Sequence, residues 1–232
     1  MGLQGKTVIV TGGFGALGAK VAAALIAEGA NVALVDRAPA APAGLLEGFG
    51  ASAAGFAGRD LSDSADAKRT VNEAAEKFGG LYGLVNIAGG FRWETLKDGD
   101  LATWDFMYAV NLKSAVATCK AALPHLSKGG RIINIGAGAA AKAVAGMGAY
   151  AASKAGVARL TEALSEEVKA QGITVNAILP SIIDTPANRR DMPDADFKKW
   201  VTPEAIGDVI VFLLSEKSRA ITGASIPVPG LM

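Results

Sequence analysis

Short runs of β-branched and other apolar residues alternate with longer helical stretches along the whole sequence. The predicted strands cover residues 6–10, 31–36, 52–58, 83–89, 131–136, 173–179 and 223–230. The predicted helices cover residues 15–29, 63–78, 101–126, 149–170 and 202–215, and a connection rich in proline, glycine and alanine occupies residues 37–50. Strands that alternate with helices in this way form a parallel sheet, because each crossover places a helix on a face of the sheet. The alternation therefore predicts an α/β fold, a doubly wound parallel sheet with helices on both faces.

The length of the chain fits a single domain that spans residues 1–232. Half of the 232 residues are hydrophobic, which is enough for one sizeable core. No linker and no internal repeat divides the sequence. The segment from about residue 180 to residue 202 reads as a long loop in which local helix can form. We expect this loop to cover a substrate.

Charge and composition argue against several classes of partner. The net charge is +1 and no basic run stands out, so neither nucleic acid nor an anionic membrane is expected as a partner. Cys119 is the single cysteine and His125 the single histidine, so we expect neither a disulfide framework nor a transition-metal site. No uncharged apolar run approaches the roughly 18 residues of a membrane span, and the N-terminus leads straight into a strand. We expect a cytoplasmic protein that acts on a small molecule.

The turn after the first predicted strand, "TGGFGALG" (11–18), is rich in glycine. Two spacings fit a dinucleotide-binding turn, Gly13-x-Gly15-x-x-Gly18 and Gly12-x-x-Gly15-x-x-Gly18. Glycine allows a close approach of the backbone, and the helix that follows directs its first N–H groups at a pyrophosphate. A bare structural turn is the alternative, but the preceding strand and the following helix and acid favour cofactor binding. The predicted cofactor contacts in this segment are Gly12, Phe14, Gly15, Ala16, Leu17 and Gly18.

Acidic and small residues follow the next three strands. Asp36 ends the second strand, where a carboxylate accepts hydrogen bonds from ribose hydroxyls and repels a 2′-phosphate, so NAD(H) is favoured over NADP(H). Arg37 softens that preference and keeps NADP(H) as the alternative. Asp60 and Leu61 follow the third strand and are placed beside the adenine, although Asp60 alternatively starts a turn. The end of the fourth strand adds three predicted cofactor contacts, which are Asn86, Ala88 and Gly89.

Tyr150 and Lys154 lie one helical turn apart, so both side chains project from one face of a predicted helix. Tyr150 is the predicted proton donor, because an ammonium close to a phenol favours the phenolate and lowers the pKa of the tyrosine. Lys154 is also placed to hold the nicotinamide ribose. A core or interface tyrosine and a solvated lysine are the alternatives. A hydroxyl that would grip a reacting carbonyl is missing, since no serine or threonine lies between Ser127 and Ser153.

These motifs resemble the short-chain dehydrogenase/reductase family over nearly the whole chain. The resemblance rests on the glycine turn, Asp36, Asp60, Asn86-x-Ala88-Gly89, Asn111, Tyr150-x-x-x-Lys154 and Pro180…Thr185. It implies a Rossmann-type fold and a nicotinamide cofactor. It also implies that Asn111 supports a water-mediated proton path to Lys154. Ile183 and Thr185 would contact the nicotinamide, and Pro180 would shape that wall.

Three positions depart from the usual motifs of the family, which place glycine at Ala16, asparagine at Ile87 and a catalytic serine at Ala137. One branch, quinoid dihydropteridine reductase, is similar in its glycine turn, in an aromatic residue after the fourth strand, in the lack of the serine and in a loop like residues 179–200. This resemblance implies NADH-dependent transfer of hydride to a quinonoid dihydropterin, a flat conjugated acceptor. The predicted substrate contacts are Phe91, Trp93, Ala137, Tyr150 and Asn188.

Two other interpretations stay open. The chain is alternatively a reductase of the same branch that acts on a quinone, an imine or an activated carbonyl, or a non-catalytic NAD-binding sensor or subunit. Turnover of a simple ketone would need a water or Asn134 in place of the missing hydroxyl. The family resemblance also implies a homodimer or homotetramer, formed through the apolar helices at residues 101–126 and 149–170.

Overall fold

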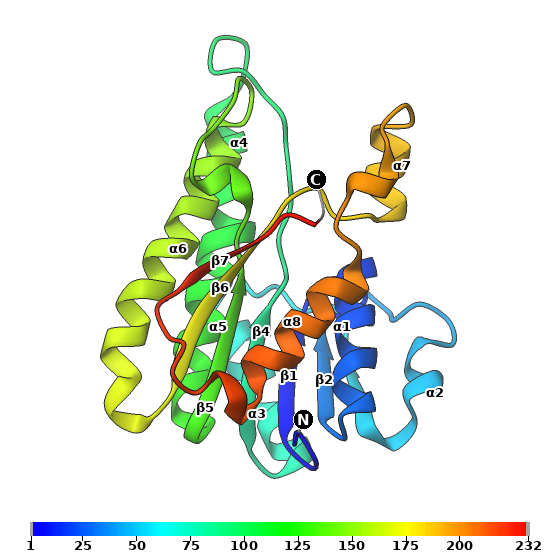
Figure 1. The fold of residues 1–232 in the computed structure, drawn as a ribbon, viewed down its shortest axis with the longest axis vertical. Coiled ribbons are helices and arrows are strands. Elements are labelled where there is room, and N and C mark those ends of the chain that lie inside the picture. Colours follow the sequence, from blue (N-terminus) through cyan, green and yellow to red (C-terminus); the bar gives the residue numbers. More distant parts are fainter. Residues whose placement is uncertain (1, 231–232) are drawn as a thin grey trace.

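A computed structural model describes residues 2–230, and these residues form one sheet of seven parallel strands (Figure 1). The strands are β1 (Thr7–Thr11), β2 (Asn31–Val35), β3 (Ala53–Phe56), β4 (Leu81–Asn86), β5 (Leu126–Ile135), β6 (Thr174–Pro180) and β7 (Ser225–Val228). Their order across the sheet is β3-β2-β1-β4-β5-β6-β7. The predicted doubly wound parallel sheet is confirmed. From β1 the chain adds β2 and β3 on one side of the sheet, and from β4 it adds β5 to β7 on the other side, so the strand order reverses between β1 and β4. Ligands of such sheets bind beyond the carboxyl ends of the strands at this point.

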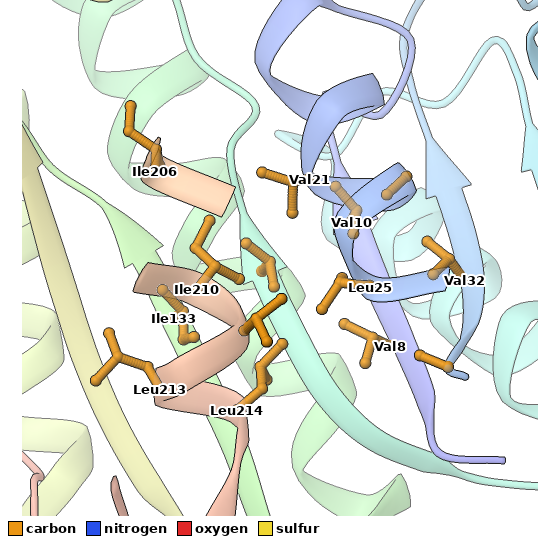
Figure 2. Close-up of a cluster of buried hydrophobic side chains, with 14 of the residues drawn as sticks. Val8, Val10, Val21, Leu25, Val32, Ile133, Ile206, Ile210, Leu213 and Leu214 are labelled. Carbon is orange, nitrogen blue, oxygen red and sulfur yellow. The ribbon is translucent and has the colours of Figure 1, made fainter. Parts of the chain in front are cut away.

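Helices cover both faces of the sheet (Figure 1). They are α1 (Ala16–Ala27), α2 (Leu45–Phe49), α3 (Ser64–Phe78), α4 (Leu101–Met107), α5 (Ser114–Ala122), α6 (Gly148–Val168), α7 (Pro186–Asp191) and α8 (Pro203–Leu214). Helices α1 and α8 pack on one face, and α3, α5 and α6 pack on the other. Figure 2 shows the first core, where Leu25 of α1 and Ile210 of α8 meet Val8 of β1. Each such fully buried aliphatic side chain stabilises the fold by about 1.5–3 kcal/mol.

Helices α3 and α8 begin with side-chain caps. Asp63 caps α3 by accepting a hydrogen bond from the Asp66 N–H at 2.8 Å. Thr202 caps α8 by accepting one from the Ala205 N–H at 3.2 Å, and Pro203 occupies the first helical position. Such caps satisfy backbone donors that the first turn of a helix leaves free.

The predicted continuous helix over residues 101–126 is wrong in its middle and at its end. A π-helix spans Tyr108–Lys113 between α4 and α5, a 3-10 turn covers Leu123–His125, and β5 begins at Leu126, five residues earlier than predicted. The wide turn places Asn111 beside the exit of β4, where its amide bonds to the backbone of Gly90. Tertiary hydrogen bonds of this kind support a π-turn that hydrophobic periodicity does not reveal.

The loop from about residue 180 to residue 202 contains local helix, as expected. Helix α7 and a 3-10 turn at Phe197–Lys199 lie within it. A single parallel bridge between Ile183 and Val201 closes its base. Among residues 2–230, no helix combines the length and hydrophobicity needed to cross a membrane.

Candidate active site

A cavity of about 690 Å³ opens at the carboxyl ends of the strands, over the reversal between β1 and β4. Its walls come from the turn after β1, the ends of β2, β3 and β4, the segment from α4 to α5, and α7. The lining residues are Gly12, Gly15, Ala16, Leu17, Gly18, Asp36, Arg37, Arg59, Asp60, Leu61, Ser62, Ile87, Ala88, Gly89, Gly90, Phe106, Val110, Ser114, Thr185, Pro186, Ala187 and Arg190. Its volume is typical of cofactor and substrate sites.

The glycine turn forms one wall of this cavity with the second of the two predicted spacings. Gly12 has a φ of +65°, and a Cβ there would lie 3.1 Å from the backbone nitrogen of Ala88. A Cβ on Gly18 would lie 2.1 Å from the carbonyl oxygen of Gly12, so the turn and α1 approach too closely for any side chain. Gly13 packs against Leu34 instead and does not line the cavity.

The residue before α1 leaves the start of that helix free of a side-chain cap. Gly15 occupies the cap position without a side chain, so the first N–H groups of α1 are available to a ligand in the cavity. Phe14 lies in the same turn, but its ring packs against the core beside Gly55 and does not line the cavity. The cradle of close backbone approaches and free N–H groups fits the pyrophosphate of a dinucleotide.

Two carboxylates face the cavity from the ends of β2 and β3. Asp36 is fixed by two backbone donors, the N–H of Phe14 at 3.1 Å and the N–H of Ala38 at 3.0 Å. Asp60 accepts hydrogen bonds from the hydroxyl and the N–H of Ser62, which lower the pKa of the Asp60 carboxyl. Both residues line the cavity, and Asp60 also shapes a turn, which was its alternative.

Asn86, predicted as a cofactor contact, is not among the residues that line the cavity. Its side chain is buried against α5, where it donates to Asn134 Oδ1 at 2.9 Å and accepts from the Thr118 hydroxyl at 2.7 Å. Asn134 is fully buried in the same network and donates to Thr161, so it cannot replace the missing hydroxyl. Residues paired across neighbouring strands point to the same face of the sheet, which explains why the side chains of Asn86 and Asn134 lie in the same buried network.

The exit of β4 is instead positioned by a residue that sequence reasoning missed. The hydroxyl of Thr11, at the end of β1, accepts hydrogen bonds from the N–H groups of Ile87 and Ala88, both at 3.0 Å. These two bonds hold Ile87 and Ala88, which follow β4, next to Gly12 at the point where the strand order reverses. A threonine at the end of a buried strand was the available signal.

Lys154 and Asn111 meet beside Gly89. A Cβ on Gly89 would lie 2.5 Å from Asn111 Oδ1 and 3.6 Å from Lys154 Nζ, and Gly89 itself lines the cavity. Asn111 donates to Ser153 Oγ at 3.0 Å and accepts from the Gly90 N–H at 3.0 Å. The structure therefore brings the predicted lysine and asparagine together at the edge of the cavity.

The lysine of this pair is buried and donates to the carbonyl oxygen of Ile135 at 2.7 Å. Burial lowers the pKa of Lys154 to about 8, because removal from water disfavours the ammonium form. Burial also raises the pKa of Tyr150, opposite to the predicted direction. The correction has a physical reason, since Lys154 directs a hydrogen bond to a backbone carbonyl and the desolvation of the phenol dominates.

The two aromatic residues after β4 have different neighbours. The ring of Phe91 packs edge-to-face on Tyr150, with centroids 5.0 Å apart and planes at 85°. The indole N–H of Trp93 donates to the Ala145 carbonyl at 3.0 Å, and a Cβ on Gly146 would lie 2.1 Å from the indole ring. Phe91 thus borders the predicted proton donor, whereas Trp93 ties its loop to the loop before α6.

The remaining predicted contacts lie around the base of the substrate loop. Thr185 lines the cavity and caps α7, accepting from the Asn188 N–H at 3.2 Å. Asn188 turns back and donates to the Ile183 carbonyl at 2.8 Å, while Ile183 packs against the core. Pro180, like Ala137, is buried at a strand end. Several of the predicted site residues do not line the cavity itself, among them Asn111, Ala137, Tyr150, Lys154, Pro180, Ile183 and Asn188.

Several lining residues escaped the sequence reasoning. Arg59 and Ser62 flank the predicted Asp60–Leu61 pair, so nearness to that pair was a usable signal. Phe106, Val110 and Ser114 reach the cavity from a segment that contains the π-helix, which the sequence pattern did not indicate. No group of three or more His, Cys, Asp or Glu side chains among residues 2–230 is placed to hold a metal ion.

The buried lysine gives a testable pH dependence. Between about pH 8 and about pH 10.5, the unfolded chain keeps a proton on Lys154 that the folded chain has released. The free energy of unfolding therefore rises with pH in this window, by up to about 1.4 kcal/mol per pH unit from this group. We expect Lys154→Met to remove this rise, measured as the wild-type minus variant difference in urea unfolding from about pH 7 to about pH 10.5. Taking the difference cancels the opposite contributions of Tyr150 and Cys119, whose pKa values are raised. A difference in the free energy of unfolding that stays constant with pH would contradict the lowered pKa of Lys154.

Fold and cavity together define a doubly wound α/β protein with a ligand-sized cavity where its strand order reverses. A family profile described as short chain dehydrogenase matches residues 6–196. The chain is 32% identical to 2-(S)-hydroxypropyl-CoM dehydrogenase 3 of Xanthobacter autotrophicus, over 99% of this chain and 97% of that protein. It is 33% identical to D-beta-hydroxybutyrate dehydrogenase of Cupriavidus necator, over 96% of this chain and 95% of that protein.

A solved structure is similar over the same length. The short chain dehydrogenase of Burkholderia cenocepacia in complex with NADP has a TM-score of 0.86 and 31% identity, and the match covers 98% of each chain. The chain belongs to the short-chain dehydrogenase/reductase family, and it is an NAD(P)-dependent oxidoreductase.

Proposed function

We propose that this enzyme uses NADH to reduce a flat conjugated acceptor, with a quinonoid dihydropterin as the best candidate. One observation carries the proposal. Tyr150 and Lys154 lie one turn apart on α6 and Asn111 bonds to Ser153 of the same helix, yet the position at which a second hydroxyl would stand is the buried Ala137. A site built in this way suits an acceptor that needs a proton but no second hydrogen-bond donor.

The residues that would hold the cofactor fit it. The turn from Gly12 to Gly18 would cradle the pyrophosphate, and Asp36 would accept the adenosine ribose hydroxyls. Because two backbone N–H groups fix Asp36 in place, its charge would meet a 2′-phosphate directly, which favours NAD(H). Arg37 lines the same wall and keeps NADP(H) as the alternative. When bound, the cofactor supplies the hydride at its nicotinamide ring.

The proton would come from Tyr150. Its buried phenol stays protonated at neutral pH because burial raises its pKa, so it arrives at the reaction as an acid. Asn111 fixes the turn around Gly90 and bonds to Ser153 on α6, which holds the helix that carries both Tyr150 and Lys154. Phe91, at 5.0 Å from the Tyr150 ring, offers a half-exposed aromatic surface to a flat substrate.

The lack of a second hydroxyl distinguishes acceptor classes by physics. Reduction of a ketone builds negative charge on one oxygen, and losing one donor to such an oxygen typically costs about 2.7–4 kcal/mol. A quinonoid dihydropterin spreads the incoming electron pair over several nitrogens and a carbonyl, so a single proton donor suffices. A quinone, an imine or an activated carbonyl shares this property in part and stays the alternative acceptor.

The names of the relatives favour a second candidate, the oxidation of a secondary alcohol. Both curated relatives described above are hydroxy-compound dehydrogenases by name. That activity would need a donor at the reacting oxygen that Ala137 cannot supply, and Asn134 is buried in a network with Asn86 and Thr161. A non-catalytic NAD-binding role is the third candidate.

We expect the wild type to oxidise NADH with quinonoid dihydropterin faster than with any simple ketone. Ala137→Ser should raise ketone turnover by up to about 10²- to 10³-fold, because it supplies the missing donor, and should leave dihydropterin reduction within about threefold. Steady-state rates with NADH and NADPH over a panel of dihydropterin, quinones and ketones measure this. A wild type that prefers ketones would overturn the proposal, and NADH binding without turnover across the panel would establish the non-catalytic role.

A homodimer or homotetramer remains part of the proposal. Several large apolar side chains are exposed along the segment from α4 to α5, and they are Leu101, Trp104, Tyr108 and Val116. Such a surface supports association through these helices.

A further inference from the structure

Helix α7 lines the same cavity as the glycine turn. Pro186, Ala187 and Arg190 line the cavity from this helix. The helix is held at its start by the Thr185 cap and by the bond from Asn188 to the Ile183 carbonyl. These bonds fix which side chains of α7 face inward.

Two neighbouring arginines on α7 have opposite surroundings. Arg189 makes two hydrogen bonds to the carboxylate of Asp184, at 2.6 and 2.7 Å, and lies 4.8 Å from the ring centroid of Phe197. Within residues 2–230, the guanidinium of Arg190 has no hydrogen bond and no ion pair, and it lines the cavity. The composition of the loop does not reveal this arrangement, since residues 180–202 carry as many acids as bases.

In the described part of the chain, the two acids that line the cavity have other hydrogen-bond partners and form no ion pair with Arg190. Asp36 is bonded to two backbone N–H groups, and Asp60 is bonded to Ser62. Both lie at the ends of β2 and β3. The same cavity is also lined by residues of the turn at Gly12–Gly18 and by the uncapped start of α1, which carries a partial positive charge.

We propose that Arg190 binds the pyrophosphate of the dinucleotide from the α7 side of the cavity. The inference rests on the proposed cofactor site. A guanidinium presents paired donors that match two phosphate oxygens, and the backbone N–H groups of α1 would meet other oxygens of the same anion. Arg190 is thus a further binding residue that couples the substrate loop to the cofactor.

The test measures binding without turnover. Dissociation constants for NADH, NADPH, ADP and adenosine are measured by calorimetry with wild type, Arg190→Gln and Arg190→Lys, in the absence of any acceptor. Lys198→Gln is the matched control, because Lys198 is exposed in the same loop and does not line the cavity. We expect Arg190→Gln to weaken NADH and ADP by about tenfold and adenosine by less than twofold, since adenosine lacks the pyrophosphate. Arg190→Lys should restore part of the loss, and Lys198→Gln should change nothing.

Salt supplies a second readout. Affinity of the wild type for NADH should fall more steeply with ionic strength than that of Arg190→Gln, because the variant has lost one charge contact. Equal NADH affinity in wild type and Arg190→Gln would overturn the role of Arg190 and leave the cofactor site intact. A loss confined to NADPH would also overturn it, by assigning Arg190 to the 2′-phosphate. A wild type that binds none of these nucleotides would overturn the cofactor site itself.

Discussion

Tyr150→Phe is expected to lower the rate of acceptor reduction by about 10²- to 10⁴-fold, because the variant removes the hydroxyl that we propose as the proton donor. NADH binding should stay within about threefold, since the backbone around the cofactor is unchanged. Single-turnover measurement of NADH oxidation with quinonoid dihydropterin, beside calorimetric titration with NADH, separates the two effects. The phenyl ring keeps the packing against Phe91, so loss of the hydroxyl is the only change.

The control for this variant is Tyr108→Phe, which removes an exposed hydroxyl from the π-helix. Its rate should match the wild type. A Tyr150→Phe enzyme that reduces the acceptor at the full wild-type rate would refute Tyr150 as the proton donor. It would transfer the role to a solvent proton.

Gly18→Ala is expected to destabilise the fold and to weaken NADH binding together. An added Cβ would lie 2.1 Å from the Gly12 carbonyl oxygen and 2.8 Å from the Gly13 Cα. Both are backbone atoms, so the turn or α1 must shift. Overpacking of this kind costs about 1–3 kcal/mol or more, and the shift also distorts the cradle for the pyrophosphate. We expect NADH affinity to fall by about tenfold or more.

Gly48→Ala provides the matched control, because a Cβ on Gly48 meets no atom within 4 Å and the residue lies in the short helix α2. This variant should bind NADH normally and should be as stable as the wild type or more stable by up to about 1 kcal/mol. Urea unfolding and NADH titration of both variants make the comparison. Equal stability of Gly18→Ala and Gly48→Ala would show that α1 does not need the close approach at Gly18.

The fold was accessible from the sequence because most of its signals are local. Strands such as β1 and β4 are continuous apolar runs, and the caps at Asp63 and Thr202 mark helix starts within three or four residues of sequence. The break in the predicted helix at residues 101–126 was not accessible. The amide of Asn111 bonds to Gly90, 21 residues away, and no local pattern encodes that contact.

The candidate site divides in the same way. Residues at the ends of strands, such as Asp36 and Gly89, were placed correctly at the cavity because parallel strands end at one edge. Asn86 was misplaced because a motif gives the position of a residue but not the face toward which its side chain points. The direction of the Tyr150 pKa shift failed for a related reason, since spacing gives the nearness of Lys154 but not the carbonyl to which it donates.

The buried amides of Asn86 and Asn134 have a consequence for how the sheet is assembled. Almost every other residue of β4 and of the buried half of β5 is apolar, so hydrophobicity alone would tolerate several alignments of the two strands. The two amides bond to each other and to Thr118 and Thr161 from the helices above them. A shift of β4 by one residue relative to β5 would break these bonds. It would leave polar groups unsatisfied in an apolar layer, at a cost of about 1–3 kcal/mol for each. The four side chains thus favour a single alignment of β4 and β5. In this way they fix the position of Ala88 and Gly89, which follow β4 and line the cavity.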